Sequence, residues 1–201
     1  MFSFIFSTFY DRMEKGGEKM FKKLNILDES DKHLRMKSKE VTFPLSKEDK
    51  QTIQQIIKHL TYSQIEEYAE KYDLRPGMGL AFPQLGKNIR IIVIVHEVDD
   101  EVFDNYVVIN PVIVSHSEEM IAAEVGEGCL SVNREVEGHV ARYARVTVEG
   151  YDEKGNKIKV RAREDLALAF QHEIDHLDGI LFYDRINKDH PFYSEDEIRL
   201  I

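Results

Sequence analysis

The sequence contains one cysteine, Cys129, in 201 residues, so no disulfide can form within the chain. A lone thiol is typical of proteins from a reducing compartment, and we expect a cytoplasmic protein. No run of 18 apolar residues occurs, so we expect no segment to span a membrane. Acidic residues outnumber basic ones, 37 to 27, which gives a formal net charge of -10. This charge disfavours direct nucleic-acid readout, because such binding depends on cations that neutralise phosphates.

The composition, 42% hydrophobic and 32% charged, is that of an ordinary globular chain. The length predicts a single domain, which we place at residues 31–201, after an N-terminal extension over residues 1–30 that is loosely ordered. The segment Met1–Tyr10 is apolar and aromatic, but it lacks the basic region and the cleavage site of a signal peptide. We consider three interpretations of this segment: an arm that packs on the surface, a segment translated from a start codon upstream of the natural one, or a segment that weakly touches a membrane.

The order of the predicted elements indicates the fold class. Ser46 is a good N-cap, and apolar residues recur behind it at helical spacing. Later β-branched runs, bounded by turn residues, predict strands. Strands and helices do not alternate, so we expect an α+β fold with mostly antiparallel β-sheets packed around a buried helix in the C-terminal half. The expected elements are helices from Ser46 and over 63–72, a loop over 75–84, strands at 90–95, 106–109, 121–125, 145–151 and 157–162, and a helix over 165–178 that stops at Gly179.

That last helix carries the pattern His-Glu-x-x-His at His172, Glu173 and His176. Residues i and i+4 of a helix lie on one face, so the two histidines can bind the same metal ion. Glu173 is offset by one residue and suits a general base that hydrogen-bonds a metal-bound water. A surface helix with an ordinary His/Glu pair is the alternative. The apolar run from Leu166 to Leu177 instead predicts a buried helix whose polar groups need partners.

Two histidines do not complete a catalytic metal site, which typically has three protein ligands and an open position. Glu195 or Glu197 downstream would give a zinc metallopeptidase. Cys129 would give a Cys/His/His site, and its neighbours Gly126 and Gly128 allow the backbone to approach a ligand closely. A lone cysteine is more often a small buried apolar residue, but the two histidines favour its assignment as a ligand.

Three separated motifs resemble those of the peptide deformylase family. Gly77–Gln84 is similar to G-x-G-L-A-A-P-Q, Glu127–Ser131 matches E-G-C-L-S, and Gln171–His176 matches Q-H-E-x-D-H. The resemblance covers residues 30–190 and is specific because the three motifs occur together. Phe82 departs from the usual alanine of the first motif, which affects local packing and not the chemistry. The longer segment between the first two motifs resembles the second bacterial class of the family.

The resemblance implies a metal-dependent hydrolase that removes the formyl group from the N-terminal formyl-methionine of newly synthesised polypeptides and releases formate. Cys129, His172 and His176 would hold one divalent ion per chain, and Glu173 would transfer the proton. A thiolate ligand suits Fe²⁺, which the family commonly uses, and Zn²⁺, Ni²⁺ or Co²⁺ are substitutes. A zinc metallopeptidase with Glu195 as third ligand is then the second interpretation.

The resemblance also implies roles for residues around the metal. The backbone N–H of Leu130 and the side-chain amide of Gln84 would stabilise the oxyanion. The backbone of Gly79 would pair with an extended substrate. Met78 and Leu168 are candidates for the pocket of the methionine side chain, and their alternative is a plain core role.

Two further expectations concern contacts away from the reacting atoms. By resemblance, Glu127 would form an ion pair with Arg142 and fix the loop that carries Cys129. The partners would be N-formyl-methionyl nascent peptides, and a transient contact with the ribosome is an open alternative. The tail Lys188–Ile201 has four acidic residues against two basic ones, so we expect such a contact not to use it.

Overall fold

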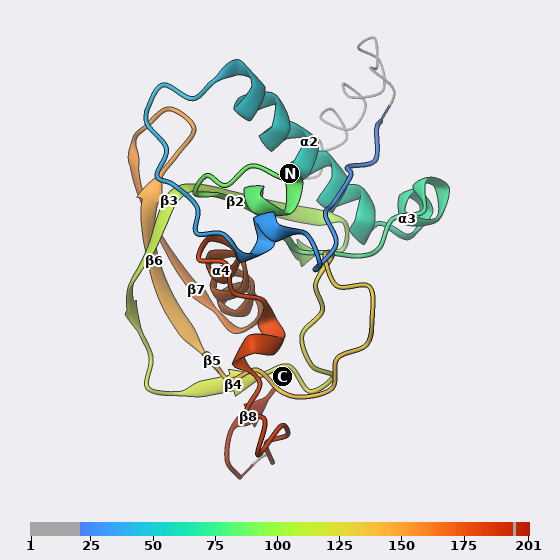
Figure 1. Ribbon diagram of the computed structural model, residues 1–201, viewed down its shortest axis with the longest axis vertical. Coiled ribbons are helices and arrows are strands. Elements are labelled where there is room, and N and C mark those ends of the chain that lie inside the picture. The colour runs from blue at the N-terminus through green and yellow to red at the C-terminus, as the bar shows by residue number, and fades with distance from the viewer. Residues whose placement is uncertain (1–20, 195) are drawn as a thin grey trace, which may run out of the picture.

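The computed structural model describes residues 21–194 and 196–201, which form two β-sheets, three α-helices and three 3₁₀-helices (Figure 1). The first sheet has the strand order β1-β2-β3-β6-β7 with every neighbouring pair antiparallel, and the second has the order β5-β4-β8 with β4 and β8 parallel. The α+β class and the mostly antiparallel pairing are therefore confirmed. In chain order the elements are η1 (Lys32–Arg35), α2 (Lys47–Gln64), α3 (Glu66–Tyr72), β1 (Gly79–Ala81), η2 (Phe82–Leu85), β2 (Ile91–Asp99), β3 (Val102–His116), β4 (Met120–Ala122), β5 (Arg142–Tyr143), β6 (Arg145–Tyr151), β7 (Lys157–Arg163), α4 (Glu164–Leu177), η3 (Phe182–Arg185) and β8 (Arg199–Leu200).

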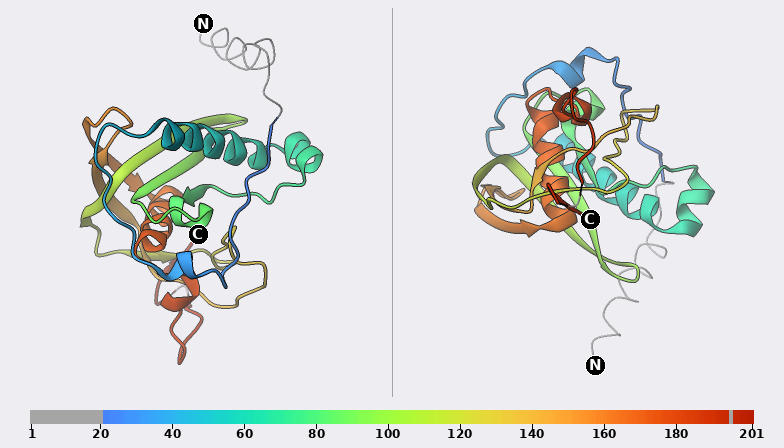
Figure 2. Two further views of the ribbon diagram at one scale, coloured as in Figure 1. Left: turned by 45° about the horizontal axis from the view of Figure 1, so that its top comes forward. Right: turned by 90° about the horizontal axis from the view of Figure 1, so that it is seen from below.

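Strand β2 shows why the larger sheet is buried on both faces. Successive side chains of a strand point to opposite faces, so an unbroken apolar run serves two cores at once. Ile91 and Val93 pack toward α2, whereas Ile92 and Ile94 pack toward α4. Helices α2 and α4 therefore cover opposite faces of the sheet, as Figures 1 and 2 show. The smaller sheet lies below α4 in Figure 1.

Three expectations about strands differ from the structure. We predicted a loop over residues 75–84, but Gly79–Ala81 pairs with β2 as an edge strand, and η2 follows it directly. We predicted a short strand at 106–109, but β3 extends over Val102–His116. The strand continues past Pro111 because register shifts between Ile109 and Val112 and between Ile113 and Ser115 accommodate the interruption. The short range of β4 also replaces the strand predicted over 121–125.

The predicted helix boundaries rest on capping residues that the structure confirms. Ser46 precedes α2, and its Oγ accepts a hydrogen bond from the Asp49 N–H at 3.0 Å. Gly179 follows α4 with φ +76°, the left-handed conformation that ends many helices.

Part of the expected N-terminal extension can be described. Residues 1–20, including Met1–Tyr10, lie outside the described residues. Residues 21–28 form no regular helix or strand, yet the backbone N–H of Leu27 donates to Gln84 O and that of Glu29 to Ser131 O, both at 2.8 Å. The segment therefore contacts two of the motifs identified in the sequence. Within the described part of the chain, no helix is long and apolar enough to cross a membrane.

The buried residue His59 makes the stability of this fold sensitive to acid. It is 2% exposed on α2, and burial, with a smaller effect of the Lys23 charge, lowers its pKa from 6.5 to about 4. The unfolded chain binds a proton on His59 below its ordinary pKa and the folded chain does not, so the stability that the neutral imidazole contributes is lost as the pH falls from 6.5 toward 4.

We predict that His59→Gln, which keeps an acceptor for the Leu24 N–H, weakens this dependence. Between about pH 7.5 and pH 5, the free energy of unfolding should fall by about 2 kcal/mol less in the variant than in the wild type. Urea unfolding at both pH values measures the difference. Equal losses in the two proteins would show that His59 does not titrate as proposed.

Candidate active site

Helix α4 places two histidines and one glutamate on its inner surface. Its apolar residues pack into the core formed with β2, β6 and β7, and this packing also buries the polar residues near its C-terminal end. Glu173 is 3% exposed and His176 is 1% exposed. Burial lowers the pKa of His176 well below its ordinary value, so its imidazole stays neutral, the form that binds a metal.

Cys129 supplies the third donor of a candidate metal site. It lies on the loop over residues 123–141, between β4 and β5, and its Sγ is 3.3 Å from Nε2 of His176. One donor atom each from Cys129, His172 and His176 lies within 4.8 Å of the others. The thiolate and imidazole donors fit a divalent transition metal with an open position for a reactant.

Of the two alternative third ligands, the structure describes Glu197, whereas Glu195 lies outside the described residues. Glu197 accepts hydrogen bonds from the Ser194 backbone N–H and hydroxyl and contacts His190 Nε2 at 3.0 Å. Among the described residues, the donor that converges with both histidines is Cys129, so the zinc-peptidase interpretation is not favoured.

The predicted ion pair between Glu127 and Arg142 is confirmed. Arg142 Nε and Nη2 donate to the two carboxylate oxygens of Glu127 at 2.7 and 3.0 Å, and the side chains are 3% and 7% exposed. Glu127 Oε2 also lies 2.9 Å from Nδ1 of His172, which leaves Nε2 of that ring for a metal. Burial alone would raise the pKa of Glu127, but the hydrogen bonds from His172 and Arg142 lower it to about 2, so the carboxylate stays charged.

The sequence did not indicate that this pair continues into a larger network. Arg142 Nη1 donates to Asp175 Oδ2 at 2.6 Å, and Arg185 forms two hydrogen bonds with the same carboxylate. Asp175 lies between the two histidines of the Q-H-E-x-D-H motif. A buried acid in an apolar helix requires a cation, and that requirement was the signal available in the sequence.

Glu173 faces the metal donors and the first motif. Its Oε2 is buried and has no hydrogen-bond partner among the described residues. Burial raises the pKa of Glu173 to about 7, a value suited to a group that accepts and returns a proton near neutral pH. The approach to Gly79 is close, because a Cβ atom built on that glycine would lie 2.8 Å from Cδ of Glu173.

Gln84 is fixed beside the cysteine by hydrogen bonds of its side-chain amide. Its Oε1 accepts from the Ala81 N–H at 2.8 Å, so Nε2 points toward Ser131 Oγ at 3.2 Å and Cys129 Sγ at 3.8 Å. The backbone N–H of Leu130 donates to no described residue. Phe82, the departure from the family motif, is 0% exposed and packs in the core beneath α2.

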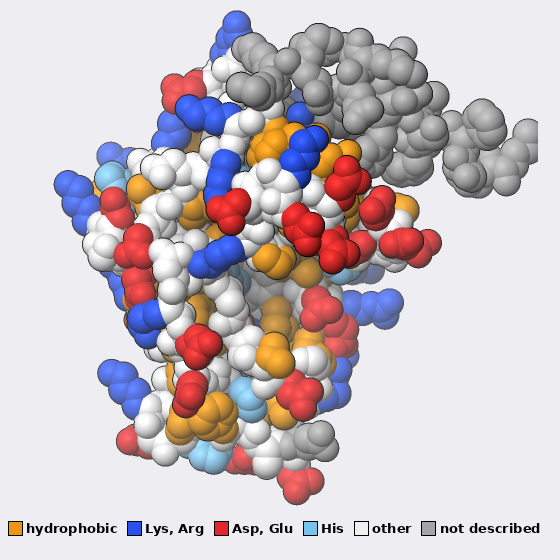
Figure 3. Space-filling view, turned by 90° about the vertical axis from the view of Figure 1, so that its right-hand side faces the viewer, with side chains coloured by type: hydrophobic (Ala, Val, Ile, Leu, Met, Phe, Trp, Pro, Cys, Tyr) orange, Lys and Arg blue, Asp and Glu red, His pale blue; other side chains and the backbone are white. Residues whose placement is uncertain are grey.

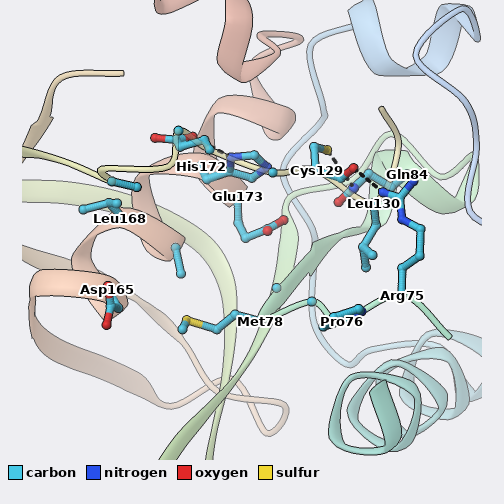
Figure 4. Close-up of a pocket in the computed structure, with 17 residues that line it drawn as sticks. Arg75, Pro76, Met78, Gln84, Cys129, Leu130, Asp165, Leu168, His172 and Glu173 are labelled. Atoms are coloured by element: carbon cyan, nitrogen blue, oxygen red, sulfur yellow. Dashed lines mark hydrogen bonds and ion pairs between the residues drawn. The ribbon is translucent and has the colours of Figure 1, made fainter. Parts of the chain in front are cut away.

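A cavity of about 350 Å³ joins these residues (Figure 4). Met78 and Leu168 line one end of it, Cys129 and Leu130 line the other, and Glu173 lies between the two ends. Gly79 and Gln84 also line the cavity, so the structure brings together all the site residues predicted from the sequence, apart from the buried ligand His176 behind it.

Arg75 is a site residue that the sequence analysis missed. Its Nη2 donates to the carbonyl oxygen of Cys129 at 2.6 Å, and its Nη1 donates to Asn133 Oδ1 at 2.7 Å. Arg75 also lines the cavity. It stands two residues before Gly77, but nothing in the sequence indicated that it reaches the cysteine loop.

The fold and the donor set define a metal-dependent hydrolase. The sequence profile of the polypeptide deformylase family matches residues 23–192. Peptide deformylase 2 of Bacillus cereus is 46% identical over 174 residues, which are 86% of this chain and 94% of that protein. A peptide deformylase of Listeria welshimeri is 47% identical over 175 residues, 87% of this chain and 95% of that protein. A crystal structure of a class I type b peptide deformylase from Acinetobacter baumannii, with Met-Ala-Ser bound, has a TM-score of 0.66 at 26% identity and covers 83% of this chain and 100% of that chain.

The chain therefore belongs to the peptide deformylase family. It is an enzyme that removes the formyl group from the N-terminus of nascent formyl-methionyl peptides in a metal-dependent reaction.

The close contact between Gly79 and Glu173 gives a test of the site geometry. We predict that Gly79→Ala lowers kcat/KM by about 10²-fold, because the added methyl group displaces the Glu173 carboxylate. Formate release from formyl-Met-Ala-Ser measures the effect. Metal content of the same preparation is the control, because Gly79 is not one of the three candidate donors and the variant should keep the metal. Activity of Gly79→Ala within about threefold of the wild type would contradict the prediction.

Proposed function

We propose that Cys129, His172 and His176 hold the metal ion and that Glu173 is the general acid and base of deformylation. A divalent ion bound there supplies Lewis acidity toward the formyl oxygen and makes water a stronger nucleophile near neutral pH. The Glu173 carboxylate takes a proton from the attacking water and delivers it to the amine as the C–N bond breaks, leaving formate and a free N-terminus. The observation that carries this proposal is the buried, unpartnered Glu173 oxygen beside three converging metal donors.

Leu130 and Gln84 are the proposed oxyanion donors. As water adds to the formyl carbon, negative charge develops on the formyl oxygen and needs fixed donors nearby. The Leu130 N–H has no partner among the described residues, and the Gln84 amide is oriented by the Ala81 N–H. The Leu130 N–H would therefore donate without breaking a hydrogen bond, whereas Gln84 Nε2 would exchange its long contact with Cys129 Sγ, at 3.8 Å, for the oxyanion.

The edge position of β1 supports a substrate site at Gly79. This strand is first in the order of its sheet, and among the described strands it pairs with β2 alone, so its other edge is available to an extended peptide. Met78 and Leu168 line the end of the cavity where we place the methionine side chain. The tripeptide Met-Ala-Ser, bound by the Acinetobacter relative, is the product that formyl-Met-Ala-Ser would give on deformylation.

We propose Fe²⁺ as the physiological metal, with Zn²⁺, Ni²⁺ or Co²⁺ able to substitute. The thiolate of Cys129 is a softer donor than the carboxylate of a His/His/Glu site and is compatible with a ferrous ion. The donor set is shared by all four ions, so metal analysis of anaerobically purified protein is needed to identify the one present.

We further infer that the enzyme is of the second bacterial class, with residues 31–201 as one catalytic domain whose sheets pack around the helix carrying both histidines. Its substrates are nascent chains, which supports a cytoplasmic location. Any contact with the ribosome should avoid the C-terminal tail. There, β8 pairs with β4, and Arg199, one of the two basic residues of the tail, is bound to Glu119 and Glu164.

The role of Glu173 is tested by Glu173→Gln. The amide cannot transfer the proton, so kcat should fall by about 10²–10⁴-fold while the variant still binds one metal ion per chain. Formate release and metal content are measured on the same preparation. Cys129→Ala provides the contrast, because it should lose the metal together with the activity. A Glu173→Gln variant that keeps more than roughly a third of the wild-type kcat would refute the assignment.

A further inference from the structure

Strand β7 presents a row of cations to solvent. Lys157, Lys159, Arg161 and Arg163 occupy alternate positions and are exposed, whereas the intervening Ile158, Val160 and Ala162 pack against the core around α4. The pleat of the strand therefore separates the two sets onto opposite faces. Arg145 of β6 pairs in register with Arg163 and is also exposed, and we refer to these five basic residues as the basic face.

Most of this positive charge is not neutralised within the protein. Lys159 forms an ion pair with the exposed Glu149 at 2.7 Å, and Arg145 forms one with Glu119 at 2.8 Å. Within residues 21–194 and 196–201, no acidic group lies within ion-pair distance of Lys157, Arg161 or Arg163.

At one end of the row, hydroxyl groups lie beside the cations and line a hollow with them. Its volume is about 510 Å³, and it lies between β3, β6 and β7. Arginine binds phosphate oxygens through two parallel N–H donors, and hydroxyl groups also donate to phosphate. The polar side chains that line the hollow are Ser115, His116, Ser117, Thr147, Arg145, Arg161 and Arg163.

Protection of the sheet edge is the simplest role for charge on β7, because edge strands often carry charged residues that block pairing with other chains. Charge of either sign serves that purpose. Acidic residues outnumber basic ones in this chain, 37 to 27, yet all four exposed charges on the strand are basic. Edge protection therefore does not explain their common sign.

We propose that the basic face binds the phosphate backbone of folded RNA. The row from Lys157 to Arg163 is about 20 Å long at about 3.3 Å per residue. One strand of a duplex places roughly six phosphates over that length. The whole chain has a net charge of -10, so approach of RNA requires a local concentration of cations such as the basic face.

An anionic membrane fits this surface less well. Peripheral membrane binding combines cations with apolar side chains that enter the lipid. The exposed apolar residues Val112 and Val114 of β3 line a hollow with Lys157 and Lys159 at one end of the row, and the arginine end has no exposed apolar residue among those that line its hollow. A flat bilayer would also approach the acidic surroundings of the basic face, whereas an RNA helix can contact the row alone.

The arrangement leaves the active site open. The β6–β7 hairpin lies on the left of Figure 1, and the loop that carries Cys129 lies on the right. Figure 3, which views the molecule from that right-hand side, shows a hollowed face with many acidic side chains. An RNA bound to the basic face would therefore leave this side free for a nascent peptide, and the ribosome is a source of both ligands.

The test compares two double variants with equal changes in charge. Lys157→Glu with Arg161→Glu alters the basic face, and the control, Lys37→Glu with Lys188→Glu, alters exposed lysines elsewhere, including one in the C-terminal tail. The probes are a labelled RNA duplex, titrated at several salt concentrations, and isolated ribosomes in co-sedimentation. The basic-face variant should bind the duplex at least about tenfold more weakly and show a salt dependence smaller by roughly two phosphate contacts. The control should stay within about twofold of wild type.

Activity on free formyl-Met-Ala-Ser separates this proposal from the catalytic one, since all three proteins should have equal kcat/KM. Equal weakening of RNA binding in both variants would show that only the net charge of the protein matters, and it would overturn the proposal. Binding of the wild type to phosphatidylserine vesicles but not to RNA would overturn it in favour of a membrane.

A second inference concerns Arg75 and rests on the proposed oxyanion role of Leu130. The carbonyl of Cys129 and the N–H of Leu130 belong to one planar trans peptide unit, so they point in opposite directions. The charged Arg75 group holds that carbonyl at 2.6 Å. The geometry points to Arg75 as a positioning residue that fixes the direction of the Leu130 N–H and polarises it through the peptide unit.

The test uses Arg75→Ala and Arg75→Lys, with Arg134→Ala as the control. Arg134 also ties the cysteine loop to another segment, through Glu29 at 2.8 Å, but it does not contact the Cys129 carbonyl. Arg75→Ala should lower kcat by about tenfold with KM within about twofold and metal content unchanged, and millimolar guanidinium should restore part of the activity. Arg75→Lys should be intermediate. A kcat unchanged in Arg75→Ala, or lowered equally in Arg134→Ala, would refute this role while leaving the deformylase activity of the wild type established.

Discussion

The buried ion pair between Glu127 and Arg142 is the contact on which the site depends. The two residues belong to the loop that carries Cys129 and to β5 behind it, and the Glu127 carboxylate also receives Nδ1 of His172 from α4. One carboxylate thus joins two of the three metal donors. Arg142 extends the connection to Asp175, a second point on the same helix. The loop has little regular structure, so these charge-assisted hydrogen bonds fix its position relative to the helix.

Burial of these charges is a costly way to fix a loop. Well-packed apolar residues often stabilise a fold as much as a buried ion pair or more, and removal of one charged partner costs about 3–5 kcal/mol. Apolar side chains could not orient the His172 ring, however, because orientation requires an acceptor for Nδ1. The hydrogen bonds that lower the pKa of Glu127 to about 2 keep that acceptor charged near neutral pH. We infer that the pair serves the geometry of the metal donors more than stability.

Features set by neighbouring residues were predictable from the sequence, and features set by distant contacts were not. Ser46 and Gly179 mark helix ends through bonds to nearby residues, and the spacing of His172 and His176 needs only a helix. The strand at Gly79–Ala81 exists because β2 supplies its partners, 11 to 15 residues away along the chain. Likewise, the bonds of Arg75 to Cys129 and of Glu29 to Ser131 join segments more than 50 residues apart. Motif resemblance identified the ends of such contacts only where the family pattern includes them, as with Glu127 and Arg142.

The alternation of side chains along β7 separates core packing on one face of the strand from positive charge on the other. Ile158, Val160 and Ala162 pack on the side of α4, the helix that carries both histidines, so their volumes bear directly on the position of the site. The cations between them face solvent, and a change in their charge alters the field around the protein without altering that packing. Charge at the surface is also screened over about 10 Å at moderate salt, whereas the buried network around Glu127 is not. The proposed RNA binding at the basic face and the proposed proton transfer at Glu173 can therefore vary independently, and variants of β7 should separate them.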